Sequence, residues 1–284
     1  MSKILACIDG SIYATSVCDH AAWAAKRLDV PVEILHALGR REISSRPFDL
    51  SGSLELGGRE ALLTELAEHD AQRAKLTNQR GRLILEQAAA RVKADGVSQV
   101  TERLRNGEVA DAIKEMEPEA RLVVIGKRGE AADFAKGHLG SNLERVVRSM
   151  TKPLLVASRA FQPIERFMVA FDGGRSSPMI VERLLASPLL KGVACHLFMA
   201  GDGSGEPGHR LHAAREQLAA AGYKVTVSVE AGEPETLIAE KVKRDGIGLL
   251  VMGAYGHSRL RNLLVGSTTT ALIQACTIPV LVIR

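Results

Sequence analysis

The last 36 residues of the chain, LLVMGAYGHSRLRNLLVGSTTTALIQACTIPVLVIR (249–284), predict a strand, a loop with glycines, a helix and another strand. The first apolar run ends at Gly253, Gly256 follows, and after nine intervening residues Gly266 and Ser267 precede a helical pattern. Short apolar runs bounded by glycine are typical of buried strands. Glycine at such places often indicates that a ligand or another backbone comes too close for a Cβ atom.

The same succession of elements occurs twice along the chain. KILACIDGS (3–11) matches RFMVAFDGG (166–174), which pairs Asp9 with Asp172, and VEILHA matches ACHLFMA, which aligns His36 with His196. Four further matches keep the same order: VTERLRNGEVADAI with VTVSVEAGEPETLI, RLVVIGKRG with GLLVMGAYG, GHLGSNLERVV with LLVGSTTTALI, and KPLLVAS with IPVLVIR. A length of 284 residues suits two domains, and the repeat predicts them at 1–160 and 165–284.

The first copy carries an insertion of about 35 residues after its second strand. The insertion contains PFDLSGSLELGG (47–58) and then a long, charged helical pattern that runs to residue 94. In the second copy the same connection is the short GDGSGEPG (201–208). We therefore expect a lengthened helix in the first domain alone.

Alternating apolar runs and helical patterns predict an α/β fold of two tandem, doubly wound domains, each with a five-stranded parallel sheet. Ligands of such sheets bind outside the carboxyl ends of the strands, where the strand order reverses. Asp172 and Gly253 both follow predicted strands and belong at that edge. The last strand of each copy would leave unpaired backbone groups, which seek a partner strand. We expect the copies to pack together as an intramolecular pseudo-dimer, with a further homodimer as an option.

Composition and charge exclude several classes of protein. A formal charge of +4 is too small and too dispersed to indicate nucleic-acid binding. No run approaches the roughly 18 apolar residues of a membrane span, and Asp9 interrupts the first apolar run too early for a secretory signal. The four cysteines show neither CxxC spacing nor the density of a disulfide scaffold. These features predict a reduced, cytoplasmic protein.

The helix that starts at Gly266 and Ser267 has the character of a phosphate cradle. Its free amides favour anions, and hydroxyls follow at Ser267, Thr268 and Thr269. The preceding loop adds positive charge at His257, Arg259 and Arg261. The alternative is that Ser267 is only an N-cap and that the glycines only form a turn.

Asp172 has three possible roles. It can accept a hydrogen bond from a ribose hydroxyl, lie near a bound metal, or form a turn before Gly173. The chain has no GxxxxGK[ST] phosphate loop, and GDGSG lacks the context of a dinucleotide fingerprint. No nucleophile elbow supports hydrolase chemistry.

The pattern G-x2-G-x9-G-[ST] after a fourth strand, with Asp after the first, resembles the nucleotide-binding members of the universal stress protein family over nearly the whole chain. The resemblance implies an adenine nucleotide alpha hydrolase-like, Rossmann-like fold and ATP as ligand, with or without Mg²⁺ or Mn²⁺. It implies an ATP site at Asp172, Leu197, Gly253, Gly256, Gly266, Ser267 and Thr268. Leu197, which follows His196, matches the second-strand position whose backbone meets adenine.

The resemblance also implies a role in stress response or signalling through nucleotide-dependent interaction, with slow ATP hydrolysis at most. No catalytic residue and no metal ligand is assigned. Two rival hypotheses remain open: a slow ATPase or nucleotidyl-transfer enzyme, and a structural interaction protein without ligand. The stress signal and the protein partner are not encoded in any motif.

The first copy departs from the pattern. Ten residues separate Gly129 from Gly140, and Lys127 and Arg128 stand between the first two glycines. These cations favour phosphate, whereas the added residue shifts the helix amides relative to Gly129. Nucleotide binding at Gly126, Gly129, Gly140 and Ser141 is therefore a weaker hypothesis than binding in the second copy.

The histidines do not predict a metal site. His36 and His196 lie in strands and are expected to be hydrogen-bonded core residues. His209 and His212 are three apart on a predicted helix but lack the Cys or carboxylate partners that zinc requires.

Overall fold

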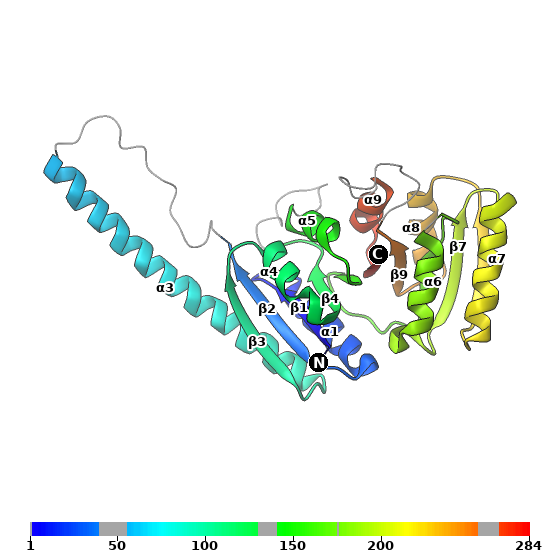
Figure 1. Cartoon of the computed structure of the whole chain (residues 1–284), viewed down its shortest axis with the longest axis horizontal. Helices are drawn as coiled ribbons and strands as arrows, with labels where there is room; N and C mark the ends of the chain where they lie inside the picture. Colours follow the sequence, from blue (N-terminus) through cyan, green and yellow to red (C-terminus); the bar gives the residue numbers. More distant parts are fainter. Residues whose placement is uncertain (1, 40–55, 130–140, 175, 255–266) are drawn as a thin grey trace.

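The computed structural model describes residues 2–39, 56–129, 141–174, 176–254 and 267–284. The first half of the chain contains β1 (Lys3–Ile8), α1 (Ala14–Leu28), β2 (Val32–Leu38), α3 (Leu56–Ala94), β3 (Val100–Asn106), α4 (Val109–Met116), η1 (Glu117–Glu119), β4 (Ala120–Gly126), α5 (Ser141–Ser149) and β5 (Leu154–Ala157). The second half contains β6 (Arg166–Ala170), α6 (Ser176–Ala186), η3 (Pro188–Leu190), β7 (Ala194–Ala200), α7 (Gly205–Ala220), β8 (Val225–Glu230), α8 (Pro234–Arg244), β9 (Leu249–Gly253), α9 (Ser267–Ala275) and β10 (Val280–Ile283). Figure 1 shows the two halves side by side.

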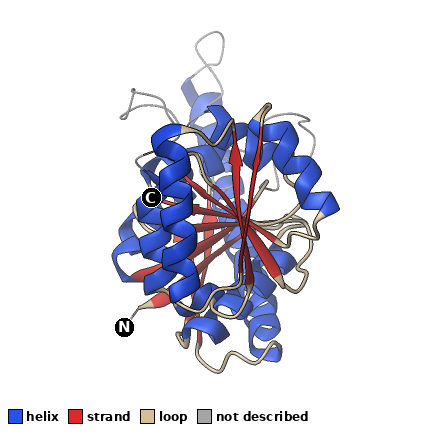
Figure 2. Cartoon of the chain, turned by 90° about the vertical axis from the view of Figure 1, so that its right-hand side faces the viewer, coloured by secondary structure: helices blue, strands red, loops and turns tan. Residues whose placement is uncertain are grey.

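The apolar runs form strands because both of their faces are covered by helices. Ile4, Leu5 and Ala6 of β1 are fully buried, and β5 and β10 are buried along their whole length. One core lies between the sheet and α1, α3, α6 and α7, and the other lies under α4, α5, α8 and α9. Figure 2 shows the twisted strands between these two helical layers. This arrangement confirms the predicted α/β fold.

The strands of both halves join in one ten-stranded sheet with the order β3-β2-β1-β4-β5-β10-β9-β6-β7-β8. Pairing is parallel within each half, but β5 and β10 pair antiparallel, with Leu155 opposite Leu281. The last strands of the two copies therefore pair with each other through their backbone groups, as expected for edges that would otherwise be unpaired. The strand order reverses between β1 and β4 and again between β6 and β9, which are the switch points of the two halves.

The predicted alignment of His36 with His196 is wrong. His36 lies opposite Ile8, the residue before Asp9. His196 lies opposite Met168, four residues before Asp172. The second-strand match is thus out of register by three residues, and His36 and His196 face opposite sides of the sheet, because a shift by an odd number reverses the side chains of a strand. β2 and β7 are apolar on both faces, so the sequence pattern does not distinguish the correct alignment of these strands from one shifted by three residues.

The expected insertion is the long helix α3, which has 39 residues against 16 in α7. The carboxyl-terminal part of α3 packs on the sheet through Leu85, Ala89 and Val92. Its amino-terminal part projects well beyond the strands (Figure 1). Among the described residues, no helix is long and apolar enough to cross a membrane.

Candidate functional site

Two of the predicted site residues meet at the carboxyl edge of the second half. β6 and β9 are neighbours, with Val169 opposite Val251. Asp172 follows the end of β6, and Gly253 is the last residue of β9. Both residues are partly exposed, so this part of the switch point is open to a ligand.

Asp172 organises the turn that leads into α6. Its Oδ1 accepts hydrogen bonds from the backbone N–H of Gly174 and from the hydroxyl of Ser177, each at 2.8 Å. Asp172 also has a further interaction in the structure. The turn-forming role is therefore present, and any ligand contact would be added to it.

The glycines after Asp172 are required by close approaches. Gly173 has a φ of +65°, and a Cβ atom there would lie 2.5 Å from Cβ of Pro207. A Cβ atom on Gly174 would lie 2.9 Å from Oδ2 of Asp172. Any other residue at either position would displace the turn that holds the carboxylate at the sheet edge.

The helix expected after the loop is α9. It begins at Ser267 and follows β9 in the chain. Thr269, in the first turn of α9, is buried, and its hydroxyl lies 3.3 Å from the carbonyl oxygen of Ala254 and 3.5 Å from that of Gly253. Ala254 in turn donates its N–H to Ile283 of β10. Thr269 is therefore a positioning residue that ties the helix to the strand end, and the prediction that its hydroxyl faces phosphate is wrong.

Several predicted site residues lie outside the described residues. These are Gly256 and Gly266, together with the loop cations His257, Arg259 and Arg261. Ser267 and Thr268 belong to α9 by their backbone. Their helical placement agrees with the predicted start of the helix.

Leu197 does not lie at the sheet edge. It is fully buried in the middle of β7, between Val169 of β6 and Val227 of β8. The strand ends three residues later at Ala200. The error follows from the shifted second-strand alignment. Continuing the register of β6 and β7 by two residues beyond the pair Ala170 and Phe198 brings Ala200 level with Asp172.

The corresponding edge of the first half brings Asp9 and Gly129 together. A Cβ atom on Gly129 would lie 3.0 Å from Oδ2 of Asp9, whose Oδ1 accepts the N–H of Ser11 at 3.0 Å. Gly126 is equally close to Tyr13, since a Cβ there would lie 2.8 Å from Cβ of that residue. Ser141 begins α5, and Gly140 lies outside the described residues.

Lys127 does not have the role expected for it at the candidate phosphate site of the first half. Its ammonium group donates hydrogen bonds to the main-chain carbonyls of Gln274 and Cys276, at 2.6 and 2.7 Å. Both carbonyls belong to the carboxyl end of α9 in the other half of the chain. The prediction that Lys127 favours phosphate in the first copy is therefore wrong, because this cation completes a contact between the halves.

His36 and His196 are hydrogen-bonded core residues, as predicted. Nδ1 of His36 lies 2.9 Å from the carbonyl oxygen of Ile8. His196 contacts the hydroxyls of Ser228 and Thr226 at 2.8 and 3.0 Å, and its pKa is lowered by burial and, secondarily, by the charge of Lys241. In the part of the chain that the structure covers, no group of three or more His, Cys, Asp or Glu side chains is placed to hold a metal ion.

A family model with the description "Universal stress protein family" matches residues 1–158 and again residues 163–284. The chain belongs to the universal stress protein family. The two matches coincide with the two halves of the sheet, so each half is one family unit.

Two relatives that are similar over almost their whole length are also named universal stress proteins. The chain is 36% identical over 287 residues to Universal stress protein Slr1230 of Synechocystis sp., with all of both chains covered. It is 25% identical over 308 residues to a universal stress protein of Mycolicibacterium smegmatis, covering 99% of this chain and 96% of the relative. The crystal structure of a universal stress protein from Archaeoglobus fulgidus is similar with a TM-score of 0.72 at 19% identity, covering 99% of this chain and 98% of that one, which supports the fold.

Proposed function

We propose that the second half of this universal stress protein binds ATP as a regulatory ligand at the carboxyl edge of β6, β7 and β9. The phosphates would meet the amino end of α9 at Gly266, Ser267 and Thr268. Asp172 would hold the ribose, and the backbone of Ala200, in place of Leu197, would meet adenine. Gly253 and Gly256 would leave room for the nucleotide.

The observation that carries this proposal is that the first turn of α9 is hydrogen-bonded to the carboxyl end of β9. Thr269 joins the first turn of α9 to the carbonyl groups of Gly253 and Ala254, while Asp172 is held on the adjacent strand end. The amino end of a helix that is held beside the point where the strand order reverses is a preorganised anion site, because its amides need no rearrangement to meet a phosphate.

The proposed output is nucleotide-dependent interaction in stress response or signalling rather than turnover. Asp172 is the one acidic side chain that we place at the proposed site, and its Oδ1 is already engaged by Gly174 and Ser177. We therefore assign no general base. The rival activities are slow ATP hydrolysis or nucleotidyl transfer, and a Mg²⁺ or Mn²⁺ ion would bind through the phosphates. Assembly into a homodimer stays a prediction.

The test is to denature the purified full-length protein and analyse the released small molecules by chromatography, followed by calorimetric titration of the nucleotide-free protein with ATP. One tight site per chain is expected. A protein that releases no nucleotide and gives no heat with ATP contradicts the proposal and favours the structural interaction protein. Steady release of ADP over many turnovers would establish the enzyme instead.

A further inference from the structure

The inserted helix α3 forms a pocket with the end of β2 that has no counterpart among the predicted nucleotide-site residues. The cavity measures about 250 Å³ and is lined by His36, Leu38, Arg73, Thr77, Arg80, Gly81 and Ile84. The α3 residues among them recur at helical spacing, so they share one face of the helix. The pocket opens where α3 leaves the sheet and begins to project.

Gly81 determines how closely α3 approaches the sheet. A Cβ atom at this position would lie 2.9 Å from Cδ1 of Leu104, 3.1 Å from Cδ2 of His36 and 3.3 Å from Cδ2 of Leu38. With any larger residue here, either these side chains or the helix must shift, so glycine permits the close contact of α3 with the ends of β2 and β3. The next turns towards the amino end of α3 then lie beyond the end of β2, where they form one wall of the pocket.

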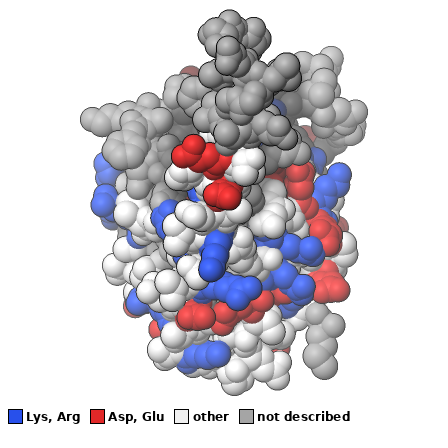
Figure 3. Space-filling model, turned by 90° about the vertical axis from the view of Figure 1, so that its left-hand side faces the viewer, with Lys and Arg blue, Asp and Glu red and all other residues white. Residues whose placement is uncertain are grey.

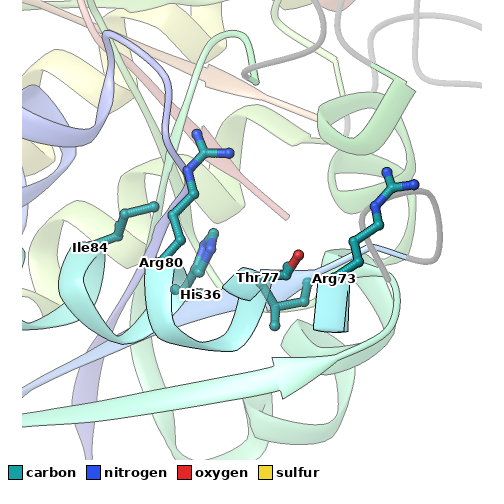
Figure 4. Close-up of a pocket in the computed structure, with 7 residues that line it drawn as sticks. His36, Arg73, Thr77, Arg80 and Ile84 are labelled. Carbon is teal, nitrogen blue, oxygen red and sulfur yellow. The ribbon is translucent and has the colours of Figure 1, made fainter. Parts of the chain in front are cut away.

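The polar groups of the pocket are of the kind that binds anions. Figure 4 shows the side chains of Arg73 and Arg80 extending to the same side of α3, with the Thr77 hydroxyl and the His36 ring between them. Among the lining residues that the structure describes, none is acidic. The Nδ1 of His36 must carry hydrogen, because its partner, the carbonyl oxygen of Ile8, can only accept. The other edge of the ring is then the one left for the pocket.

Charge and size narrow the class of ligand. Two guanidinium groups match the charge of a phosphoryl group, which is about −1.5 to −2 at neutral pH, and guanidinium binds phosphate oxygens bidentately. The volume of about 250 Å³ is below the roughly 300–1,000 Å³ of sites for drug-sized ligands, so the ligand should be small. On the face shown in Figure 3, basic and acidic side chains lie interspersed.

The second half of the chain does not repeat this wall. α7 occupies the place of α3 but begins at Gly205, shortly after β7 ends at Ala200, and it has less than half the length of α3. The pocket is thus a product of the insertion and not of the duplicated unit.

We propose that the pocket between α3 and β2 is a second anion site, which binds the phosphoryl group of a small metabolite or inorganic phosphate. Arg73 and Arg80 bind the phosphoryl oxygens, Thr77 donates its hydroxyl, and Leu38 and Ile84 contact the apolar part of the ligand. Arg73, Thr77 and Arg80 each have another interaction in the structure, so the ligand competes with existing contacts. The site is separate from the nucleotide site proposed at α9.

The test uses the full chain labelled with ¹⁵N-histidine, because the ring of His36 lines this pocket. Its signal is assigned by its loss in His36→Gln, and inorganic phosphate and glycerol 1-phosphate are added in separate titrations. We expect a saturating shift of the His36 signal in the unchanged protein. Arg80→Gln should weaken binding at least about tenfold, the lower limit for losing a hydrogen bond to a charged group. Tighter binding of glycerol 1-phosphate identifies a phosphate monoester as ligand, and tighter binding of inorganic phosphate identifies the free ion.

Arg82→Gln is the matched control, since Arg82 is exposed on the same helix and does not line the pocket. It should bind like the unchanged protein, and so should Gly266→Val, which addresses the nucleotide site instead. The proposal is overturned if neither titrant shifts the His36 signal, if sodium chloride at equal ionic strength reproduces the shift, or if Arg82→Gln weakens binding as much as Arg80→Gln. Loss of the His36 response in Gly266→Val would also overturn it, because the anion would then act from the second half.

Discussion

The ammonium group of Lys127 lies 2.7 Å from the main-chain carbonyl oxygen of Cys276, across the junction of the two halves. The opposite contact is made by Arg284, whose guanidinium group donates to the carbonyls of Arg148 and Met150 at 2.6 Å each. Each half therefore supplies one cation to the carboxyl end of a helix in the other half, where a helix favours positive charge. The antiparallel pairing of β5 with β10 makes this possible, because it brings the end of each of these two strands beside the start of the other.

Lys127→Met should destabilise the whole chain. It removes two hydrogen bonds from a partly buried charged donor and leaves the carbonyls of Gln274 and Cys276 without that partner. Hydrogen bonds to charged groups contribute about 1.5–3 kcal/mol, and we expect a loss of that order in the free energy of unfolding by urea. Arg128→Met in the same loop is the control and should change stability by less than about 0.5 kcal/mol. Equal effects of the two substitutions would mean that the cross-junction contact contributes nothing.

Ser267→Ala should weaken ATP binding about 10- to 100-fold, because it removes a hydrogen bond to a charged phosphate, which is worth about 1.5–3 kcal/mol. Adenosine, which lacks the phosphates, should bind almost unchanged. Gly266→Val should weaken ATP more strongly, since its side chain would occupy the approach to the helix amides. Calorimetry with ATP, ADP and adenosine measures these effects.

Ser141→Ala is the control for that series, because Ser141 begins α5 in the first half as Ser267 begins α9 in the second. It should leave ATP binding unchanged. If Ser141→Ala or Gly140→Val abolishes binding while Gly266→Val does not, the site belongs to the first half. An equal loss of ATP and adenosine in Ser267→Ala would contradict the phosphate cradle.

Asp172→Asn should weaken ATP and adenosine together if the carboxylate holds the ribose. The asparagine oxygen can still accept from Gly174 and Ser177, so the turn should persist and stability should change little. Asp202→Asn is a matched control, because Asp202 accepts from the N–H and hydroxyl of Ser204 in a similar turn after β7. A loss of ATP affinity seen only with Mg²⁺ or Mn²⁺ present, with adenosine unaffected, would assign Asp172 to a metal instead.

Gly81→Ala should destabilise the protein, although replacing a helical glycine by alanine ordinarily stabilises by about 0.8–1 kcal/mol. The new methyl group would meet Cδ1 of Leu104 at 2.9 Å and Cδ2 of His36 at 3.1 Å, so these side chains or α3 itself must shift. Overpacking of this kind typically costs about 1–3 kcal/mol. Thermal unfolding beside Gln79→Ala, an exposed change on the same helix, checks the sign. A gain in stability for Gly81→Ala would show that the close approach is not required.

His20 should make stability depend on pH below neutrality. Its ring is fully buried against Phe161, its Nε2 has no partner among the described residues, and burial lowers its pKa. The unfolded chain then binds the proton more readily than the folded one, so stability is complete above about pH 6.5 and falls as the pH drops towards the lowered pKa. Urea unfolding between pH 7.5 and about 5.5 should show a shallower loss for His20→Leu than for the unchanged protein. The same slope in both would rule out this residue, and His69→Gln, at an exposed position on α3, should keep the original slope.

The sequence by itself determined the duplication, the alternation of strands and helices and the start of the last helix at Ser267. These features are local or repeated: apolar runs fix the strands, and a glycine followed by Ser and Thr marks the start of a helix. The positions of Asp172 and Gly253 at one sheet edge followed as well, because parallel strands that feed into helices end on the same side.

Only the tertiary structure decided which residues of neighbouring strands lie side by side and which residues from distant segments share a surface. β2 and β7 are apolar on both faces, so the register that sets Ala200 rather than Leu197 beside Asp172 became visible only through pairing with β1 and β6. The direction of Lys127 depends on a helix end about 150 residues away in the chain, and the α3 pocket depends on the contact of Gly81 with two strands. Such relations arise from packing between distant segments, and the pattern of residues along the chain contains no local signal for them.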